Sequence, residues 1–438
     1  MIVGLGKTGI SCARYFARHG IPFSVMDHKE SPPGLTDLHE IAPDVSCEKV
    51  TEAGLMSASE IVLSPGVPRS LPAVQVAIAK GVPVTGDIAM FSELADAPVI
   101  VITGSNGKST VTAMVGAMAQ AAGVNAGVGG NIGTPCLDLL EKGYSLYVIE
   151  ASSYQLETAL NLKSKVAVVL NLTPDHLDRY PDAETYFETK ANVYRHCEVA
   201  VLCRDVMYPF DLSGVERVIT FGSDEPTDAR SFGVRRDKGE LYLCQGDKRI
   251  ISVNELPVRG GHNYLNALAS LSIGSALDWD FNAMTQALRG FSGLPHRCEV
   301  VATIDGVTYI NDSKSTNPGS AIAAVEGLAV ENRPIHLILG GQDKGADFGA
   351  LAAVLKGRVV GVLVYGVDRD NIARQISGVC DPQLFETLAD VVTRIKSTAK
   401  AGELALLSPG CASLDQFKNF EHRGEAFRQL VLSGEESS

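Results

Sequence analysis

The sequence predicts an α/β protein made of three doubly wound blocks, and three observations support this. Short apolar runs recur along the chain, each ending in Gly, Asn, Asp or Ser and followed by residues in helical rhythm. Continuous β-branched runs of this kind are typical of parallel strands covered by helices on both faces. The 438 residues are enough for two to four domains of about 100–200 residues each. The clearest runs are Ile61–Leu63, Val99–Ile102, Leu146–Ile149, Val166–Leu170, His336–Leu339, Val359–Tyr365 and Leu404–Leu407.

Two stretches separate the blocks. Residues 86–98 divide the first block from the strand that begins at Val99, and GFSGLPHR at 290–297 joins a long helical region to a new strand. Between Val215 and Val258 polar and apolar residues alternate, with turns at 237–239 and 245–247, which predicts a small antiparallel annex on the central block. We therefore expect domains at residues 1–88, 89–293 and 294–438.

Composition excludes several classes of protein. Lys plus Arg total 38 against 51 Asp plus Glu, so the net charge of −13 argues against a nucleic-acid-binding protein. With 45% apolar and 20% charged residues, the composition is globular. The nine cysteines lack CxxC spacing, which indicates reduced thiols in a cytoplasmic protein. No apolar run approaches the ~18–20 residues of a membrane helix, so we expect no membrane insertion and no secretion.

A glycine-rich turn opens the chain. Gly4-Leu5-Gly6-Lys7-Thr8-Gly9 fits GxGxxG, with helical rhythm over Ser11–His19 and a strand over Pro22–Met26 that leads to Asp27. Glycines let the backbone approach a diphosphate at a helix N-terminus. A dinucleotide, another nucleotide diphosphate and a plain tight turn all fit this pattern. Only three residues precede Gly4, so the first strand should be very short, and we expect the natural start further upstream.

A second turn carries a stronger phosphate-binding signal. The strand Pro98–Ile102 leads into TGSNGKST at 103–110, which opens a helix predicted over Val111–Ala122. Gly107-Lys108-Ser109 matches the end of a P-loop, in which the lysine contacts the β- and γ-phosphates and the hydroxyl binds Mg²⁺. The first glycine of that pattern would fall at Ile102, so a tighter loop beginning at Gly104 must wrap the phosphates.

Functional side chains follow the next two strands. Glu150 comes directly after Leu146–Ile149, and His176 lies in NLTPDHLDRY (171–180), after Val166–Leu170. Because the carboxyl ends of parallel strands share one edge, both should face the bound phosphates. A carboxylate there suits Mg²⁺. Alternatively, Glu150 only complements a helix dipole and His176 only hydrogen-bonds locally.

Lys190 lies on an unusual helix face. Over Tyr186–Tyr194 helical spacing groups it with Tyr186, Phe187, Val193 and Tyr194, which makes an aromatic surface. A buried lysine is costly unless it is paired or modified. The alternative is a lysine whose ammonium extends to the helix edge.

The third block also places polar residues after its strands. Lysines and hydroxyls gathered at one sheet edge predict an anion-binding site, with solvated loops as the alternative. The segments are NDSKSTNPGS (311–320), GGQDKGADF (340–348) and SPGCASLDQFKNFEHRG (408–424).

Together and in this order, these segments resemble the Mur ligase family over essentially the whole chain. Further family marks are EASSYQLE (150–157), GGHNYLNALA (260–269) and LPHR (294–297). The resemblance implies a three-domain fold: an N-terminal Rossmann-like domain, a central P-loop ATPase domain and a C-terminal Rossmann-like domain. The 340–348 and 408–424 segments are similar to those of the family member that adds D-glutamate.

The resemblance implies an ATP-driven amide synthesis in cytoplasmic peptidoglycan precursor formation. The carboxylate of UDP-N-acetylmuramoyl-L-alanine would attack the γ-phosphate to give an acyl phosphate, which the amine of D-glutamate then attacks. ATP and Mg²⁺, at two sites, are the implied cofactors, and we expect a monomer. The rivals are another family member, such as a folylpolyglutamate synthase, and a P-loop switch or transport ATPase.

Residue roles also follow from the resemblance. The implied catalytic residues are Lys108, His176 and Lys190, and Lys190 matches a lysine that is carbamylated to become a magnesium ligand. The implied metal ligands are Ser109, Glu150, His176 and Lys190. The implied ATP contacts are Gly104, Asn106, Gly107, Lys108, Ser109, Thr110, Asn263, Asn266, Arg297 and Asp312. The implied UDP-substrate contacts are Lys7, Thr8, Asp27, Gly66 and Asn131. The implied D-glutamate contacts are Lys314, Thr316, Lys344, Ser413, Leu414 and Phe420.

Overall fold

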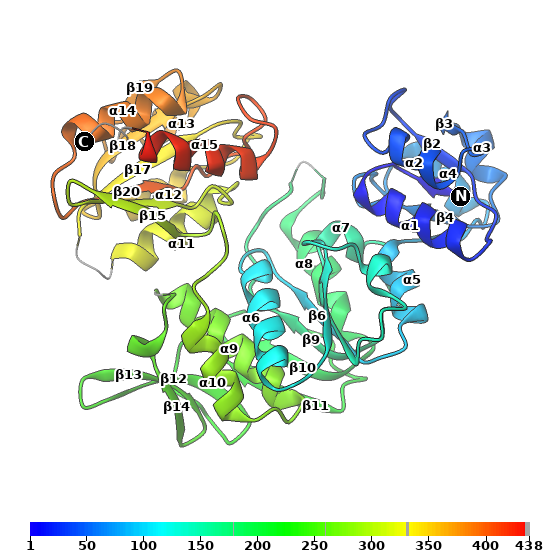
Figure 1. Cartoon of the computed structure of the whole chain (residues 1–438), viewed down its shortest axis with the longest axis horizontal. Helices are drawn as coiled ribbons and strands as arrows, with labels where there is room; N and C mark the ends of the chain where they lie inside the picture. Colours follow the sequence, from blue (N-terminus) through cyan, green and yellow to red (C-terminus); the bar gives the residue numbers. More distant parts are fainter. Residues whose placement is uncertain (178, 259, 330–332, 434–438) are drawn as a thin grey trace. The chain divides into compact units, whose positions relative to one another are not determined.

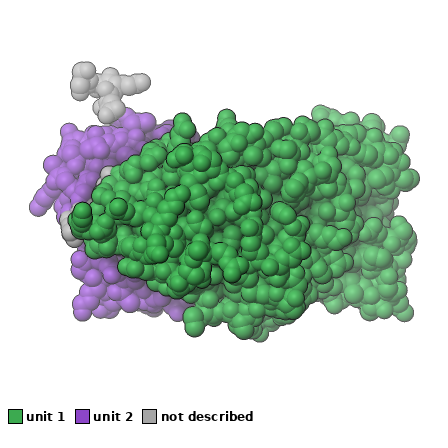
Figure 2. Space-filling model, turned by 90° about the horizontal axis from the view of Figure 1, so that it is seen from below, with its two compact units in different colours: residues 1–255, 265–290 green, residues 256–264, 291–438 purple. Residues whose placement is uncertain are grey.

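The computed structural model describes residues 1–177, 179–258, 260–329 and 333–433. These residues form three α/β blocks, each built around its own sheet (Figure 1). The chain divides into two compact units, residues 1–255 with 265–290 and residues 256–264 with 291–438 (Figure 2). The first unit holds two of the sheets and the second holds the third. Within the described residues, no helix is long and apolar enough to cross a membrane.

The first sheet has five parallel strands in the order β3-β2-β1-β4-β5. The short first strand is central, and its two residues face opposite ways: Ile2 packs with α1 and α2, whereas Val3 packs with α3 and α4. This alternation lets helices cover both faces. The elements are β1 (Ile2–Val3), α1 (Lys7–Arg18), β2 (Val25–Asp27), α2 (Leu35–Ile41), β3 (Cys47–Lys49), α3 (Glu52–Met56), β4 (Ile61–Leu63), α4 (Pro72–Ala79) and β5 (Val84–Thr85).

The second sheet has nine strands in the order β14-β13-β12-β11-β10-β9-β6-β8-β7. β6 is central and lies between β8 and β9, so the loops that follow these three strands share one edge. Its first half contains α5 (Asp87–Leu94), β6 (Val99–Thr103), α6 (Lys108–Ala121), β7 (Ala126–Gly130), η1 (Cys136–Leu139), β8 (Leu146–Glu150), α7 (Ser153–Leu156) and β9 (Ser164–Val169). The rest is α8 (Ala183–Ala191), η2 (Asn192–Tyr194), β10 (Cys197–Cys203), β11 (Arg217–Phe221), β12 (Ser231–Asp237), β13 (Glu240–Gln245), β14 (Lys248–Ser252), η3 (Val253–Glu255), α9 (Gly261–Ala276) and α10 (Phe281–Gly290).

The third sheet has the order β15-β16-β20-β17-β18-β19, in which only the β15–β16 pair is antiparallel. Helices α11, α12 and α13 pack on one face, and α14 and α15 pack on the other. The elements are β15 (Glu299–Ile304), β16 (Val307–Asn311), α11 (Pro318–Ala329), β17 (Ile335–Gly340), α12 (Gly349–Leu355), β18 (Val359–Tyr365), α13 (Arg369–Ile376), β19 (Gln383–Phe385), α14 (Leu388–Thr398), β20 (Leu404–Leu407) and α15 (Phe420–Leu432).

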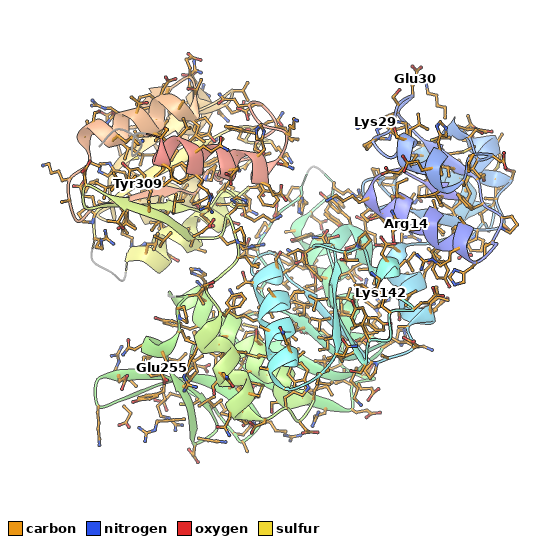
Figure 3. All side chains as sticks on the ribbon, in the orientation of Figure 1. Arg14, Lys29, Glu30, Lys142, Glu255 and Tyr309 are labelled. Carbon is orange, nitrogen blue, oxygen red and sulfur yellow. The ribbon has the colours of Figure 1, made fainter. Side chains whose placement is uncertain are left out.

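The structure modifies three details of the sequence prediction. The stretch 86–98 contains helix α5, whose Ile88 and Phe91 enter a core shared by the first two sheets. The antiparallel strands β12, β13 and β14 extend the central sheet itself, because β12 also pairs in parallel with β11. Helix α1 begins at Lys7, inside the glycine-rich turn. The shared core explains why the first two sheets form one unit. Arg14 of α1, labelled in Figure 3, adds an ion pair with Asp138 of η1 over 2.5 Å.

Candidate active site

The P-loop connects β6 to α6 and depends on glycine at its last turn. Gly107 precedes the helix with φ +82°, a left-handed conformation that favours glycine. A Cβ atom there would lie 2.5 Å from Oδ1 of Asn266, so this side chain from α9 sits directly against the loop. Ser109 and Thr110 are buried in the first turn of α6. The helix N-terminus thus presents backbone N–H groups and a hydroxyl where a phosphate can bind.

Hydrogen bonds join the P-loop to the loop after β9. The backbone N–H of Asn106 donates to Oδ1 of Asn171 at 2.8 Å, and Nδ2 of Asn171 donates back to the Asn106 carbonyl at 3.0 Å. Ser105 donates its hydroxyl to the Thr173 carbonyl at 2.8 Å and accepts from the Thr173 N–H at 3.0 Å. The two loops are therefore held as one surface.

Two lysines meet on this surface. Nζ of Lys108 donates to the carbonyl oxygens of Gly104 and Ser105, both at 2.8 Å, and Nζ of Lys190 donates to the same Gly104 oxygen at 3.0 Å. Lys190 is 1% exposed and its Nζ lies 4.7 Å from the centroid of the Tyr186 ring. Burial, and then the charge of Lys108, hold the pKa of Lys190 well below its usual range. Lys190 therefore does lie on an aromatic, buried face.

Glu150 is the last residue of β8 and carries an unsatisfied oxygen. Its side chain is buried, and Oε1 accepts a hydrogen bond from Nδ2 of Asn131 at 2.7 Å. Its other oxygen, Oε2, has no hydrogen-bond partner among the described residues. A buried carboxylate oxygen without a donor is costly, and a hard cation would satisfy it. Glu150 also acts on Lys190, since its charge favours the protonated amine.

His176 lies in a strained turn after β9. Its φ of +57° is unusual for a residue with a side chain. Nδ1 hydrogen-bonds to the Tyr154 hydroxyl at 2.8 Å, and the His176 N–H donates to Oδ1 of Asp175 at 2.8 Å. Glu150 ends β8 and His176 follows β9, and these two strands flank the P-loop strand β6. Among the described residues, no group of three or more His, Cys, Asp or Glu could hold a metal by itself.

The opening glycine turn and Asp27 form one structure in the first sheet. Oδ2 of Asp27 accepts from the Leu5 N–H at 2.7 Å, and Oδ1 accepts from the Lys29 N–H at 2.9 Å. A Cβ atom on Gly9 would lie 2.1 Å from the Gly4 carbonyl oxygen, so the turn closes only with glycine there. Lys29 projects from the turn after β2 (Figure 3). Lys7 and Thr8 open α1, and Gly66 follows β4.

The second unit carries the remaining candidate residues. Because β20 lies between β16 and β17, the loops at 312–317, 341–347 and 408–415 share one sheet edge. The Asp312 carboxylate accepts from the Ser408 hydroxyl at 2.7 Å, and burial raises the pKa of Asp312 to about 6. Nζ of Lys314 lies 3.8 Å from the centroid of the Phe420 ring. Ser413 is buried at the same edge, while Thr316, Lys344 and Leu414 are exposed in these loops. Asn263 opens α9, and Arg297 precedes β15.

Some residues of the site were missed from the sequence. Asn171 and Thr173 join the P-loop, Tyr154 holds His176, and the buried guanidinium of Arg423 donates to the backbone of Cys411 and Ser313. All lie within the quoted motifs, three to five residues from one that was singled out. The position of a motif after a strand was therefore the feature of the sequence that pointed to these residues. That position did not indicate which residue of a motif hydrogen-bonds to which site residue.

Comparisons with known proteins agree along the whole chain. Three family models match in order: Mur ligase MurD-like, N-terminal domain over residues 1–86, Mur ligase middle domain over 102–274, and Mur ligase, glutamate ligase domain over 296–411. The UDP-N-acetylmuramoylalanine–D-glutamate ligase of Hahella chejuensis is 45% identical over 433 residues, covering 98% of this chain and 97% of that protein. The protein of that name from Marinobacter nauticus is 43% identical over 434 residues, with 98% and 97% covered. The solved MurF ligase from Thermotoga maritima in complex with ADP has a TM-score of 0.62 at 15% identity, covering 98% of this chain and 94% of that one.

Proposed function

The chain belongs to the Mur ligase family, and from this premise we propose that it joins D-glutamate to UDP-N-acetylmuramoyl-L-alanine at the expense of ATP. The observation that carries the proposal lies in the first unit. A P-loop lysine and a buried lysine meet on the Gly104 carbonyl, with the charge of the buried Glu150 acting on the second lysine. Such a site can bind two anions close together, the triphosphate of ATP and the carboxylate of the UDP-substrate.

The reaction needs activation, because a carboxylate is a poor acyl donor. The carboxylate oxygen of the L-alanyl group attacks the γ-phosphorus of ATP, the bond from that phosphorus to the β–γ bridging oxygen breaks, and ADP leaves. The D-glutamate amine then attacks the carbonyl carbon of the acyl phosphate, losing a proton, and inorganic phosphate leaves. Lys108 would neutralise the β- and γ-phosphates, and the backbone N–H groups at the start of α6 would hold them.

Ser109, Glu150 and His176, with Lys190 once modified, are the residues that would hold Mg²⁺ in two sites. The fit rests on the hydroxyl of Ser109 at the helix start and on Oε2 of Glu150, which has no hydrogen-bond partner in the described part of the chain. Bound there, Mg²⁺ supplies charge neutralisation between two anionic reactants.

Lys190 is proposed to be carbamylated. Its depressed pKa favours the neutral amine, which adds CO₂ to give a carbamate with loss of one proton. The product is a carboxylate-like anion in place of the buried Lys190 amine beside Lys108. That change would turn the repulsion between the two lysines into attraction.

The remaining assignments complete the proposal. Residues 1–88, with Lys7, Thr8, Asp27 and Gly66, would bind the UDP-substrate together with Asn131. Residues 89–293 would bind ATP, with Arg297 and Asp312 contributing from residues 294–438. The last block would also bind D-glutamate, through Lys314, Thr316, Lys344, Ser413, Leu414 and Phe420. We place the reaction in the cytoplasm, with the protein acting as a monomer.

A phosphate-release assay tests the proposal. The purified protein is mixed with ATP, Mg²⁺ and UDP-N-acetylmuramoyl-L-alanine, and a panel of amino acids is added singly. Turnover that requires D-glutamate is the expected result. Equal turnover with L-glutamate or L-lysine would contradict the assignment, as would phosphate release that does not depend on the UDP-substrate.

A further inference from the structure

Arg179 is a nearly buried cation that none of the motif roles uses. Its side chain is 10% exposed and forms an ion pair with Glu157, which is 13% exposed. Nε donates to Oε1 of Glu157 at 3.1 Å and Nη2 donates to Oε2 at 2.7 Å, so the pair is bidentate. The guanidinium also lies over the Tyr154 ring, with Cζ 4.3 Å from the ring centroid.

The same guanidinium reaches the first sheet. Nη1 donates to the Pro65 carbonyl at 2.9 Å and Nη2 donates to the Val67 carbonyl at 3.3 Å. These two carbonyls flank Gly66, in the loop after β4. That loop is tied in turn to the opening glycine turn, since the Ser64 hydroxyl donates to the Gly4 carbonyl at 2.6 Å. Arg179 thus holds the loop that borders the GxGxxG turn.

On its other side, Arg179 belongs to the turn that carries His176. The backbone N–H of Arg179 donates to the His176 carbonyl at 2.9 Å. The Tyr154 ring beneath the guanidinium bears the hydroxyl that hydrogen-bonds to His176 Nδ1 at 2.8 Å. One side chain therefore contacts both the loop at Gly66 and the residues that orient His176.

We propose that Arg179, held by Glu157, is a positioning residue that fixes the conformation of residues 65–67, the Gly66 loop, for binding of the UDP-substrate. This rests on the proposed function. Only a planar guanidinium can make a bidentate pair and contact two separate carbonyls at once, whereas an ammonium offers a single point of charge. Arg179 acts through the backbone of residues 65–67 and is not itself required to touch substrate.

The test compares Arg179→Lys with wild-type protein. Loss of the carbonyl contacts should raise KM for UDP-N-acetylmuramoyl-L-alanine about tenfold, while KM for ATP and for D-glutamate stays within about twofold. Glu157→Gln keeps the shape of the partner but weakens the pair, so it should move the same KM by a smaller factor. In the double variant, KM for UDP-N-acetylmuramoyl-L-alanine should rise by less than the product of the factors found in the two single variants.

A matched control is available in the central sheet. Nε and Nη2 of Arg204 pair with Asp224, and Nη1 donates to Thr220 at 3.1 Å and Ser231 at 2.7 Å. Arg204→Lys removes an equally hydrogen-bonded guanidinium, which within the described residues makes no hydrogen bond to the Gly66 loop, and it should leave all three KM values unchanged. A KM for the UDP-substrate that is unchanged in Arg179→Lys would overturn the inference, and so would an equal rise in all three KM values.

Thermal melting separates these outcomes from poor folding. If Arg179→Lys melts well below wild type, Glu157→Gln supplies the test, and unchanged KM values in it count against the inference. A failure of the proposed function would be recognised in the wild-type protein, which would then show no turnover of the UDP-substrate. Calorimetric binding of UDP-N-acetylmuramoyl-L-alanine without ATP then still compares Arg179→Lys with wild type.

Discussion

Lys108 and Lys190 donate to one acceptor, the carbonyl oxygen of Gly104, over 2.8 Å and 3.0 Å. The residues lie 82 positions apart in the sequence, on α6 and α8. Two ammonium groups on one oxygen repel each other, and burial of Lys190 strengthens that repulsion. Burial first, and then the charge of Lys108, hold the pKa of Lys190 well below its usual range. This pair connects phosphate binding to the chemistry proposed for Lys190.

Lys190→Ala should abolish ligase turnover, and added bicarbonate should not restore it. The reason is that the variant lacks the amine that we propose becomes a metal ligand. Initial rates of phosphate release measure the effect. Lys165→Ala is the control, because Lys165 lies on the neighbouring strand β9 and pairs with exposed Glu198. Wild-type rates in Lys190→Ala would refute the metal-ligand role.

Gly107→Ala should weaken ATP binding strongly and lower the melting temperature. A left-handed alanine costs about 1–2 kcal/mol, and its Cβ would also meet Oδ1 of Asn266 at 2.5 Å. Gly123→Ala separates the two effects, since Gly123 has φ +74° just past the other end of α6 and no atom within 4 Å of an added Cβ. It should lose stability and keep KM for ATP. An unchanged KM in Gly107→Ala would contradict the close packing of Asn266.

Asp312→Asn should gain stability relative to wild type as pH rises. Burial raises the pKa of Asp312 to about 6, whereas it is about 3.9 in the unfolded chain. The folded state therefore holds the proton more tightly. The stabilising contribution of Asp312 is full below about pH 4 and is lost as pH rises through about 6. This loss lowers the free energy of unfolding by about 3 kcal/mol.

Melting curves of both proteins between pH 4.5 and 7.5, without nucleotide, measure this. The expected result is a difference that widens with pH in favour of Asp312→Asn, beyond any constant offset from the amide. A difference that does not depend on pH would show that the folded-state pKa is not raised.

Phe420→Leu should raise KM for D-glutamate by about three- to tenfold and leave KM for ATP unchanged. The Phe420 ring lies 3.8 Å from Nζ of Lys314 and would hold that cation in place by an attraction of about 1 kcal/mol. Phe281→Leu is the control, because its ring faces Lys248 at 4.7 Å on the central sheet. Equal KM values for D-glutamate in wild type and Phe420→Leu would remove this contact from the amino-acid site.

Much of the fold could be predicted from the sequence because apolar runs and glycine turns act locally. The strand Val359–Tyr365 and the strand Leu404–Leu407 were predicted with the bounds that the structure has. Helical spacing placed Lys190 on an aromatic face, and the structure decided that its ammonium is buried there and does not extend to the helix edge. Helix α5 was missed because residues 86–98 looked like a boundary between domains. Its apolar residues Ile88 and Phe91 pack into a core shared by two sheets, and the local sequence does not indicate that packing.

The sequence by itself determined the α/β class, the phosphate-binding loop at 103–110 and the face on which Lys190 lies, because each depends on residues within one turn or one strand. Tertiary structure decided the rest. Nothing local in the chain brings Lys190 to the Gly104 oxygen, leaves Oε2 of Glu150 without a donor among the described residues, or sets Arg179 against carbonyls 112 and 114 residues away. These relations depend on the order of strands in a sheet, and strand order arises from packing that involves the whole unit.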